Sequence, residues 1–145
     1  MKVMRVSAVA VLAAAVVMGL GCRRGGGGVS TSPKELNLTE VKLAMDQAGT
    51  QPVKAFALSD QFWVFGRLEG APKGATVRVV WTGIQVDAPE VPANHVFGES
   101  QRMCNDGPFA FDLAGPQKPL TTGKFKVDVF LDGVLKQTLN FDVVR

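Results

Sequence analysis

The 145-residue sequence contains little of the chemistry that catalytic and metal sites usually need, with one histidine, two cysteines and no tyrosine. The single histidine, His95, excludes a metal site built from several histidines. No Gly-x-Ser-x-Gly nucleophile elbow occurs in the sequence. The length also excludes two large domains, because one ordinary domain takes about 100–150 residues.

Beyond the start of the chain, the sequence also lacks an excess of positive or negative charge. The whole sequence carries a formal charge of +3, but four of its 16 basic residues lie within the first 24 positions. From residue 29 onward, 12 basic residues stand against 13 acidic ones, a net charge of −1. Such a chain has no general attraction to phosphates, so we expect no nucleic-acid partner.

The first 21 residues are typical of a secretory signal. A short basic start precedes an almost entirely apolar run over residues 6–20. Gly19 and Gly21 stand three places and one place before Cys22, where a signal peptidase requires narrow side chains. We therefore expect cleavage before Cys22. An uncleaved membrane helix is the alternative, although the uncharged stretch is just under the ~20 residues that a span requires.

Gly21-Cys22 resembles the end of a bacterial lipobox, in which a small residue precedes the lipid-accepting cysteine. The resemblance to bacterial lipoprotein precursors implies a lipid on Cys22 and anchorage in the cell envelope. The family usually has leucine where this chain has Gly19, and the leucine is one place later, at Leu20. Gly19 and Gly21 also suit the ordinary signal peptidase, which would leave Cys22 without lipid.

A tether follows over residues 22–38, and its Gly/Ser-rich part cannot pack a core. Such a segment can hold a domain clear of lipid headgroups. In the lipoprotein family, aspartate directly after the cysteine commonly retains the protein at the inner membrane, whereas this chain has Arg23 there. The resemblance therefore implies the outer membrane, with the domain facing the periplasm or the cell surface.

Beyond the tether, apolar residues recur at every second position in short segments separated by turn-forming residues, which indicates half-buried strands. Three of the expected strands lie near residues 41–45, near residues 95–102, where the pattern is weaker, and over residues 135–144. Residues 39–48 contain helix formers, but their apolar spacing of two favours a strand. The inward-facing residues that the alternation predicts are Phe62, Val64, Gly66 and Leu68; Val77, Val79 and Trp81; Phe109, Phe111 and Leu113; and Phe125, Val127, Val129 and Leu131.

The last two predicted strands constrain the turn that joins them. Opposed side chains of an antiparallel pair share a face, and the apolar sets on both sides of this turn are odd-numbered. We therefore expect a three-residue turn over 131–133 with its glycine in the left-handed conformation. That turn pairs Val129 with Leu135. It also pairs Phe125 with Leu139, and all four side chains then face inward.

About seven antiparallel strands predict an all-β sandwich over residues 39–145. The run from Pro119 to Gly133 resembles the Pro-x-x-x-Gly-x-Tyr-x-Val-x-Val-x-x-x-Gly run of bacterial immunoglobulin-like lipoprotein domains, as does Trp81 on an earlier strand. The resemblance implies an immunoglobulin-like antiparallel β-sandwich. Phe125 stands where such domains usually have a corner tyrosine, so the hydrogen bond from that tyrosine to the backbone cannot form.

Outward apolar residues are the most informative candidates for a binding site. The alternation places Trp63 and Phe65 on the outer face of their strand, and it places Val80 and Phe130 outward on theirs. Large outward aromatics are either covered by the chain's own segments or exposed to a partner. Residues 84–105 are the expected cover, and a protein- or glycan-binding face at Trp63 and Phe65 is the alternative.

Two further positions carry reactive groups. Cys104 has no intramolecular partner if Cys22 is acylated, and we expect a structural thiol, with an intermolecular bond as the alternative. His95 has Asp87 and Glu90 nearby in the chain, which makes a hydrolytic or metal centre conceivable. A lone loop histidine is more often an ordinary polar residue, so we expect no catalytic residue, metal or cofactor.

The sequence thus predicts a signal peptide over 1–21, a lipidated cysteine and tether over 22–38, and one domain over 39–145. We expect the domain to act as a noncatalytic binding or assembly module with a protein partner, while the lipid on Cys22 contacts the membrane. A structural envelope spacer is one alternative. A hydrolase or metal-dependent enzyme at the His95 loop is the other.

Overall fold

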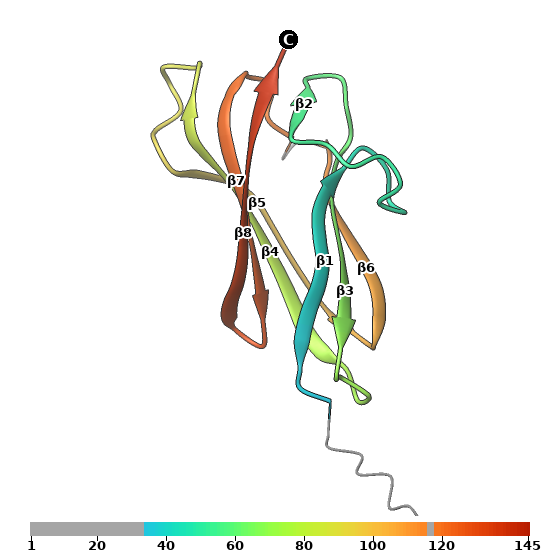
Figure 1. Ribbon diagram of the computed structural model, residues 1–145. Helices are drawn as coiled ribbons and strands as arrows, with labels where there is room; N and C mark the ends of the chain where they lie inside the picture. The colour runs from blue at the N-terminus through green and yellow to red at the C-terminus, as the bar shows by residue number, and fades with distance from the viewer. Residues whose placement is uncertain (1–33, 116–117) are drawn as a thin grey trace, which may run out of the picture. The chain divides into compact units, whose positions relative to one another are not determined.

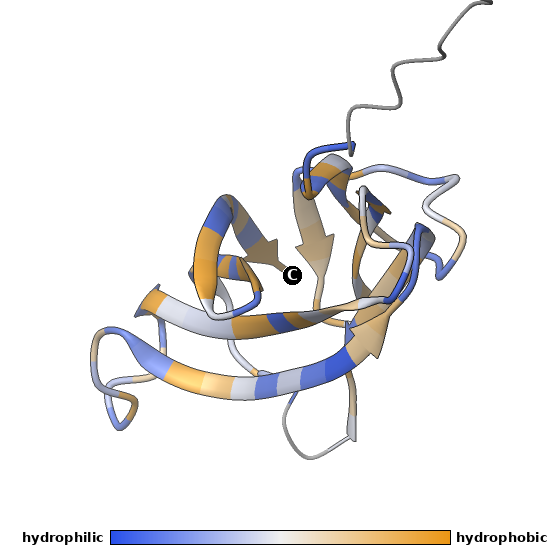
Figure 2. Cartoon of the chain, turned by 90° about the horizontal axis from the view of Figure 1, so that it is seen from below, coloured by the Kyte–Doolittle hydropathy of each residue, from blue (hydrophilic) through white to orange (hydrophobic). Residues whose placement is uncertain are grey.

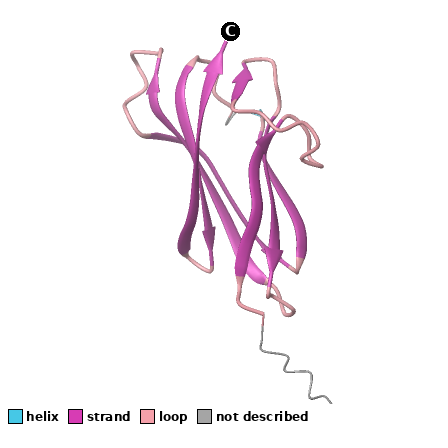
Figure 3. Cartoon of the chain, in the orientation of Figure 1, coloured by secondary structure: helices cyan, strands magenta, loops and turns pink. Residues whose placement is uncertain are grey.

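The computed structural model describes residues 34–115 and 118–145, which form eight β-strands and no α-helix (Figures 1 and 3). Seven strands correspond to the predicted ones, including the strand favoured over a helix within residues 39–48. The additional strand, β2, has three residues, too few for an alternating pattern to reveal. The strands are β1 (Asn37–Ala44), β2 (Ala55–Ala57), β3 (Phe62–Glu69), β4 (Ala75–Val86), β5 (His95–Cys104), β6 (Gly107–Leu113), β7 (Gly123–Leu131) and β8 (Val134–Val144).

The strands form two sheets that face each other (Figure 1). One sheet has the order β1-β3-β6, and the other has the order β2-β8-β7-β4-β5. The pairings are antiparallel except that of β2, which runs parallel to β8. In immunoglobulin-like domains, strands A, B and E form one sheet, and C, F and G belong to the other. Here β1, β3 and β6 take the first three positions and β4, β7 and β8 the second three, so the fold is an immunoglobulin-like β-sandwich.

The inner faces of both sheets meet in one hydrophobic core, and the predicted alternation is confirmed there. Residues of β3 alternate between buried and half-buried along the whole strand. Val64, Val79, Val127 and Val129 have no exposed surface. Figure 2 shows hydrophobic and hydrophilic bands along several of the strands. Burial of each such side chain contributes about 1.5–3 kcal/mol, so this pattern is the main source of stability.

Phe141 on β8 lies at the centre of an aromatic cluster. Its ring centroid is 5.4 Å from that of Phe56 and 5.9 Å from that of Trp81, both in edge-on geometry. Phe125 stacks on Phe141 with centroids 5.6 Å apart and ring planes 18° apart. The residue at the corner-tyrosine position therefore stabilises the core by ring packing.

The turn between β7 and β8 has two loop residues, so the predicted three-residue turn is wrong. Leu131 pairs directly with Val134. Asp132 and Gly133 between them have φ angles of +48° and +81°. Two consecutive left-handed residues are the requirement of the tight hairpin turn that matches strand twist, and Asp-Gly is a preferred sequence for it.

A β-bulge after the turn supplies the odd residue that was assigned to the loop. Phe130 pairs with Leu135 and Val129 pairs with Gln137, so Lys136 is the extra residue on β8. The bulge keeps Leu139, Phe141 and Val143 on the inner side, as predicted, but Phe125 pairs with Phe141 and Val127 with Leu139. Leu135 lies before the bulge and is 51% exposed, so its predicted inward orientation is wrong.

The predicted signal peptide, Cys22 and most of the tether fall within residues 1–33, which lie outside the described residues. In residues 34–115 and 118–145, no helix has the length and apolar character needed to span a membrane.

Candidate binding surface

Trp63 and Phe65 lie on the outer face of the three-stranded sheet. They alternate along β3 with Phe62 and Val64, whose side chains are fully buried in the core. Both outward aromatics are half-buried. Because β3 is the central strand, each of them has a cross-strand neighbour on either side. These neighbours are Lys42 and Ala110 beside Phe65, and Ala44 and Asp112 beside Trp63.

The loop between β1 and β2 covers part of Phe65. Gly49 packs so closely that a Cβ atom added to it would lie 2.6 Å from Phe65 Cγ, and its φ of +66° favours glycine. The Lys42 ammonium lies 5.2 Å from the centroid of the Phe65 ring, within the range of a cation–π interaction. The expected cover, residues 84–105, is wrong for this ring. That segment includes β5 of the other sheet, and of its residues Arg102 lines the surface beside Phe65.

Asp46 holds this covering loop in place. Its carboxylate accepts hydrogen bonds from the Thr50 hydroxyl at 2.7 Å, the Thr50 amide at 3.1 Å and the Gln51 amide at 2.9 Å. These bonds, the one from the Thr50 side chain foremost, lower the pKa of Asp46. The position of the loop over Phe65 therefore depends on the ionised carboxylate.

The surface beside Phe65 is hollowed by about 420 Å³. Phe65 provides an aromatic wall, and the guanidinium groups come from Arg67 on β3 and Arg102 on β5. Among the described residues, no aspartate or glutamate lines this hollow. The lining residues are Gln47, Ala48, Phe65, Arg67, Arg102, Pro108, Phe109 and Ala110.

The two arginines differ in how firmly they are held. Arg102 donates a hydrogen bond to the Ala110 carbonyl on β6, and its guanidinium lies 4.4 Å from the centroid of Phe111. Arg67 places its Nε 3.9 Å from a carboxylate oxygen of Glu40, which is beyond hydrogen-bond distance. The Arg67 side chain is 44% exposed. Donor groups of both arginines thus remain available at this surface.

The outer face of the five-stranded sheet carries the other two outward residues of the prediction, Val80 and Phe130. Val80 is nevertheless buried, with 9% of its surface exposed. The guanidinium of Arg78 lies 4.9 Å from the centroid of Phe130. Arg78 also donates from Nε to Glu99 at 2.6 Å, and this bond lowers the pKa of Glu99. The aromatic on this face is therefore shielded by a cation that is itself paired.

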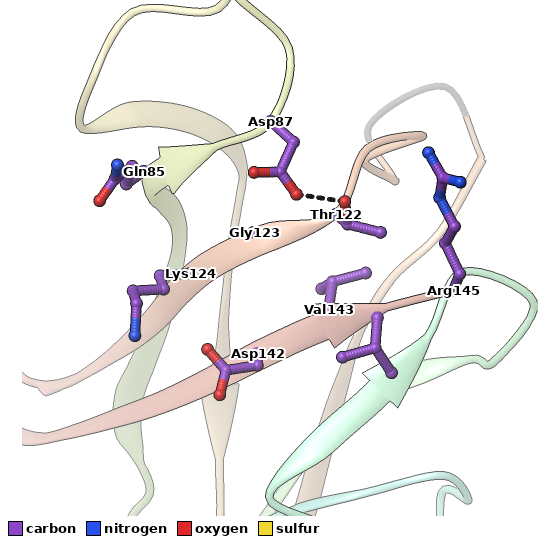
Figure 4. A pocket seen from close by; sticks show the side chains of 9 residues that line it. Gln85, Asp87, Thr122, Gly123, Lys124, Asp142, Val143 and Arg145 are labelled. Atoms are coloured by element: carbon purple, nitrogen blue, oxygen red, sulfur yellow. Dashed lines mark hydrogen bonds between the residues drawn. The ribbon is translucent and has the colours of Figure 1, made fainter.

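A pocket of about 640 Å³ lies where β4 ends and β7 begins, beside the end of β8 (Figure 4). The Thr122 hydroxyl donates a hydrogen bond to Asp87, and the Asp87 amide donates to the Thr122 carbonyl at 2.9 Å. These bonds connect the end of β4 to the start of β7. Lys124 and Asp142 are cross-strand neighbours on the wall of the same pocket. The contacts of Asp87 and Thr122 are thus those of a structural link between two strands.

Asp87, Glu90 and His95 do line one cleft, of about 620 Å³. The imidazole of His95 packs edge-on against Phe97 with ring centroids 4.8 Å apart. Within the described residues, no hydrogen bond joins His95 to either carboxylate, and no group of three or more histidine, cysteine, aspartate or glutamate residues is placed to hold a metal ion. The structure thus brings the three predicted residues to one cleft.

Cys104 ends β5 and carries a free, buried thiol. Its Sγ lies 3.8 Å from the Arg102 carbonyl oxygen, and in the sheet it pairs with Ala75. This position is that of a small apolar core residue, which agrees with the predicted structural role.

Comparison with known proteins identifies no matching family and no matching curated protein. Among solved structures, the chain is similar to an immunoglobulin-like protein from Pseudomonas aeruginosa, with 12% identity and a TM-score of 0.46 over 79% of this chain and 99% of that one. It is also similar to parts of a β-glucosidase from Listeria innocua, with 12% identity and a TM-score of 0.45, and of a β-D-glucoside glucohydrolase from Trichoderma reesei, with 13% and 0.42. In both cases the matched region is 77% of this chain, and it is 16% of the first enzyme and 19% of the second. The fold assignment rests on the strand order described above.

Proposed function

We propose that the protein is a membrane-anchored envelope lipoprotein whose immunoglobulin-like domain is a noncatalytic protein-binding or assembly module. The observation that carries the proposal is the outer face of the three-stranded sheet, where Trp63 and Phe65 stand beside a hollow with two guanidinium groups. Aromatic residues and arginine are enriched where proteins bind one another tightly. We call this surface, made of Trp63, Phe65 and the residues lining the hollow, the aromatic face.

Anchoring in this proposal occurs through a lipid on Cys22. The support is the sequence: an apolar run, a Gly-Cys junction and a Gly-rich tether before the domain. Arg23 after the cysteine favours the outer membrane. Mass measurement of the N-terminal peptide from membranes tests this part, and we expect a new N-terminus at Cys22 with acyl mass attached. An unmodified Cys22 at the N-terminus would overturn lipid anchorage and favour the ordinary signal peptidase.

The binding role can be tested by placing a photo-crosslinking amino acid at one of two exposed positions in intact cells. Pro108 lines the hollow of the aromatic face, whereas Gln101 lies on β5 of the other sheet. We expect a protein crosslink from position 108 that is lost when Trp63 and Phe65 are both replaced by serine, and none from position 101. Thermal unfolding of the double variant must first show that the domain remains folded.

The alternatives give different results in the same experiment. A structural spacer would give no specific crosslink from either position. If the double serine variant folds and retains every partner, the aromatic face is not the binding site. The hydrolase alternative has the cleft at His95 but lacks a bonded catalytic pair among the described residues, and His95→Ala is expected to leave the crosslink unchanged.

A further inference from the structure

We propose that the hollow of the aromatic face binds an acidic extended segment of a partner protein, with a carboxylate held by Arg67 and Arg102 and an apolar side chain against Phe65. This inference rests on the proposed function, because it specifies the partner chemistry of the same surface. Three features of the hollow support this inference: the charge of its lining, the available donors of its arginines and the apolar residues of its floor.

The charge of the lining has one sign although the domain as a whole is almost neutral. Arg67 and Arg102 line the hollow, and the described lining residues include no carboxylate. From residue 29 onward the sequence carries a net charge of −1, so the positive lining is a local feature. A local positive site in a neutral domain selects short acidic segments and gives no general attraction to polyanions.

The donors of both arginines are incompletely used, and those of Arg102 are also oriented. Arg102 is fixed by its bond to the Ala110 carbonyl and by packing over Phe111, and Ala110 is the cross-strand neighbour of Phe65. A guanidinium has five N–H donors, so one such bond leaves others available. Arg67 follows Phe65 on the same face of β3, with Glu40 at 3.9 Å. Planar guanidinium groups match the geometry of a carboxylate and bind it in bidentate fashion.

Apolar residues, most of them small, form the floor of the hollow. Phe65 and Ala110 are opposed across β3 and β6, and Pro108 and Ala48 complete the lining on that side. An apolar side chain two residues from an acidic residue can therefore contact the Phe65 ring while the carboxylate meets the arginines. In an extended segment, residues two apart lie on the same face, so acidic and apolar residues at every second position present both groups to the hollow. A sugar acid would supply the carboxylate without the apolar side chain, which makes a protein segment the better fit.

The test uses the purified full-length protein in detergent and a synthetic seven-residue peptide with blocked termini, Glu-Ser-Leu-Ser-Glu-Ser-Leu, whose glutamate and leucine side chains share one face of the extended chain. Calorimetric titration should show binding that weakens as salt is raised. The matched peptide with lysine in place of glutamate should not bind. Arg67→Gln should weaken binding of the glutamate peptide about tenfold, because it removes a charge-assisted hydrogen bond. Arg78→Gln is the control, because it removes an outward arginine of the other sheet that neighbours an aromatic ring, and it should change binding less than about twofold.

Several results would overturn the proposal: no binding of the glutamate peptide up to about 1 mM, equal binding of the lysine peptide, or equal losses in the Arg67→Gln and Arg78→Gln variants. Tighter binding of an acidic oligosaccharide, such as oligogalacturonate, would reassign the site to a glycan. Arg102→Lys provides a second variant that retains the charge but not the planar fork, and it should weaken binding while the protein remains folded. If the crosslink at position 108 persists and the glutamate peptide fails to bind, the binding module stands and the acidic segment is rejected.

Discussion

The two outer faces of this sandwich each carry an arginine near an outward aromatic, yet they treat the arginine differently. On the five-stranded sheet, Arg78 is bonded to Glu99 at 2.6 Å and lies over Phe130. On the three-stranded sheet, Arg67 lies next to Phe65 along the strand face, with the Glu40 carboxylate at 3.9 Å. The first arginine has its carboxylate within the domain, whereas the second retains donors for another molecule. The two arginines thus differ more clearly in their hydrogen bonding than in their aromatic neighbours.

Asp128 extends this comparison to the centre of the larger face. It is 9% exposed, although it lies on the outer side of β7, opposite Thr138 on β8. Its carboxylate accepts a hydrogen bond from the Thr138 hydroxyl at 2.6 Å and pairs with the Lys126 ammonium at 2.9 Å. A buried carboxylate with both oxygens engaged contributes to the stability of the sheet itself.

The largest effect is therefore expected from Asp128→Ala. Loss of two charge-assisted contacts should lower the free energy of unfolding by about 3 kcal/mol. Asp112→Ala is the control on the other face, where the exposed Asp112 is the cross-strand neighbour of Trp63, and it should change stability by less than about 0.5 kcal/mol. Denaturant unfolding of both variants measures the difference. Equal losses would contradict the view that the Asp128 carboxylate is held within its sheet and the Asp112 carboxylate is not.

A smaller loss is expected from Gly49→Ala, which tests the cover of the aromatic face. Gly49 has φ +66° and touches Phe65, whereas Gly133 has φ +81° and a Cβ there would meet nothing within 4 Å. Gly133→Ala should cost about 1 kcal/mol from backbone strain alone. Gly49→Ala should cost about 2 kcal/mol, because the added methyl group also displaces the Phe65 ring. Thermal unfolding gives both values. Faster proteolysis within residues 46–51 should accompany Gly49→Ala and not Gly133→Ala.

Acidification offers a milder way to separate the faces. The hydrogen bonds to Asp46 lower its pKa, so its contribution to the covering loop is present above the pH at which an unfolded aspartate titrates. That contribution is lost as the pH falls through the lowered pKa, below about pH 4. Thr50→Val removes the largest cause of the shift and should move loop opening to higher pH. Fluorescence of the half-buried Trp63 can follow the opening, with the buried Trp81 as a constant background.

The same titration has a control on the larger face. Arg78 lowers the pKa of Glu99, chiefly through their hydrogen bond. Arg78→Gln should therefore raise the pKa of Glu99 and leave the pH dependence of Trp63 fluorescence as it was. A shift of that fluorescence in Arg78→Gln equal to the shift in Thr50→Val would show that the signal does not report on the Asp46 loop.

The sequence predicts the inner faces of this protein much better than its outer ones. Alternation along β3 and β7 is enough to identify Val64 and Val127 as core residues, because a two-residue period has one physical meaning in a half-buried strand. The odd-numbered apolar positions on both sides of the turn also required one extra residue between the paired parts of β7 and β8. This requirement could not decide whether that residue belonged to the loop or to a bulge at Lys136, since both give Leu139, Phe141 and Val143 the same facing.

The aromatic face was predicted only as far as its two aromatics. Arg102 reaches Ala110 from the opposite sheet, and this contact depends on how the two sheets pack. The cover from Gly49 depends on the pairing of β1 with β3, which no local pattern reveals. Residues 84–105 were the expected cover, but most of them belong to β4 and β5 of the other sheet. The sheet to which a segment belongs depends on strand order, which alternation along the segment does not determine.

The smallest expected change in stability belongs to the residue with the largest expected role in binding. Arg67→Gln removes a side chain that is 44% exposed and makes no hydrogen bond with Glu40, so the free energy of unfolding should change by less than about 0.5 kcal/mol. The same variant should weaken the glutamate peptide about tenfold. Arg78→Gln should behave in the opposite way, with a measurable loss of stability and unchanged binding. A large loss of stability in Arg67→Gln would mean that Arg67 belongs to the fold, and the contrast between the two faces would then disappear.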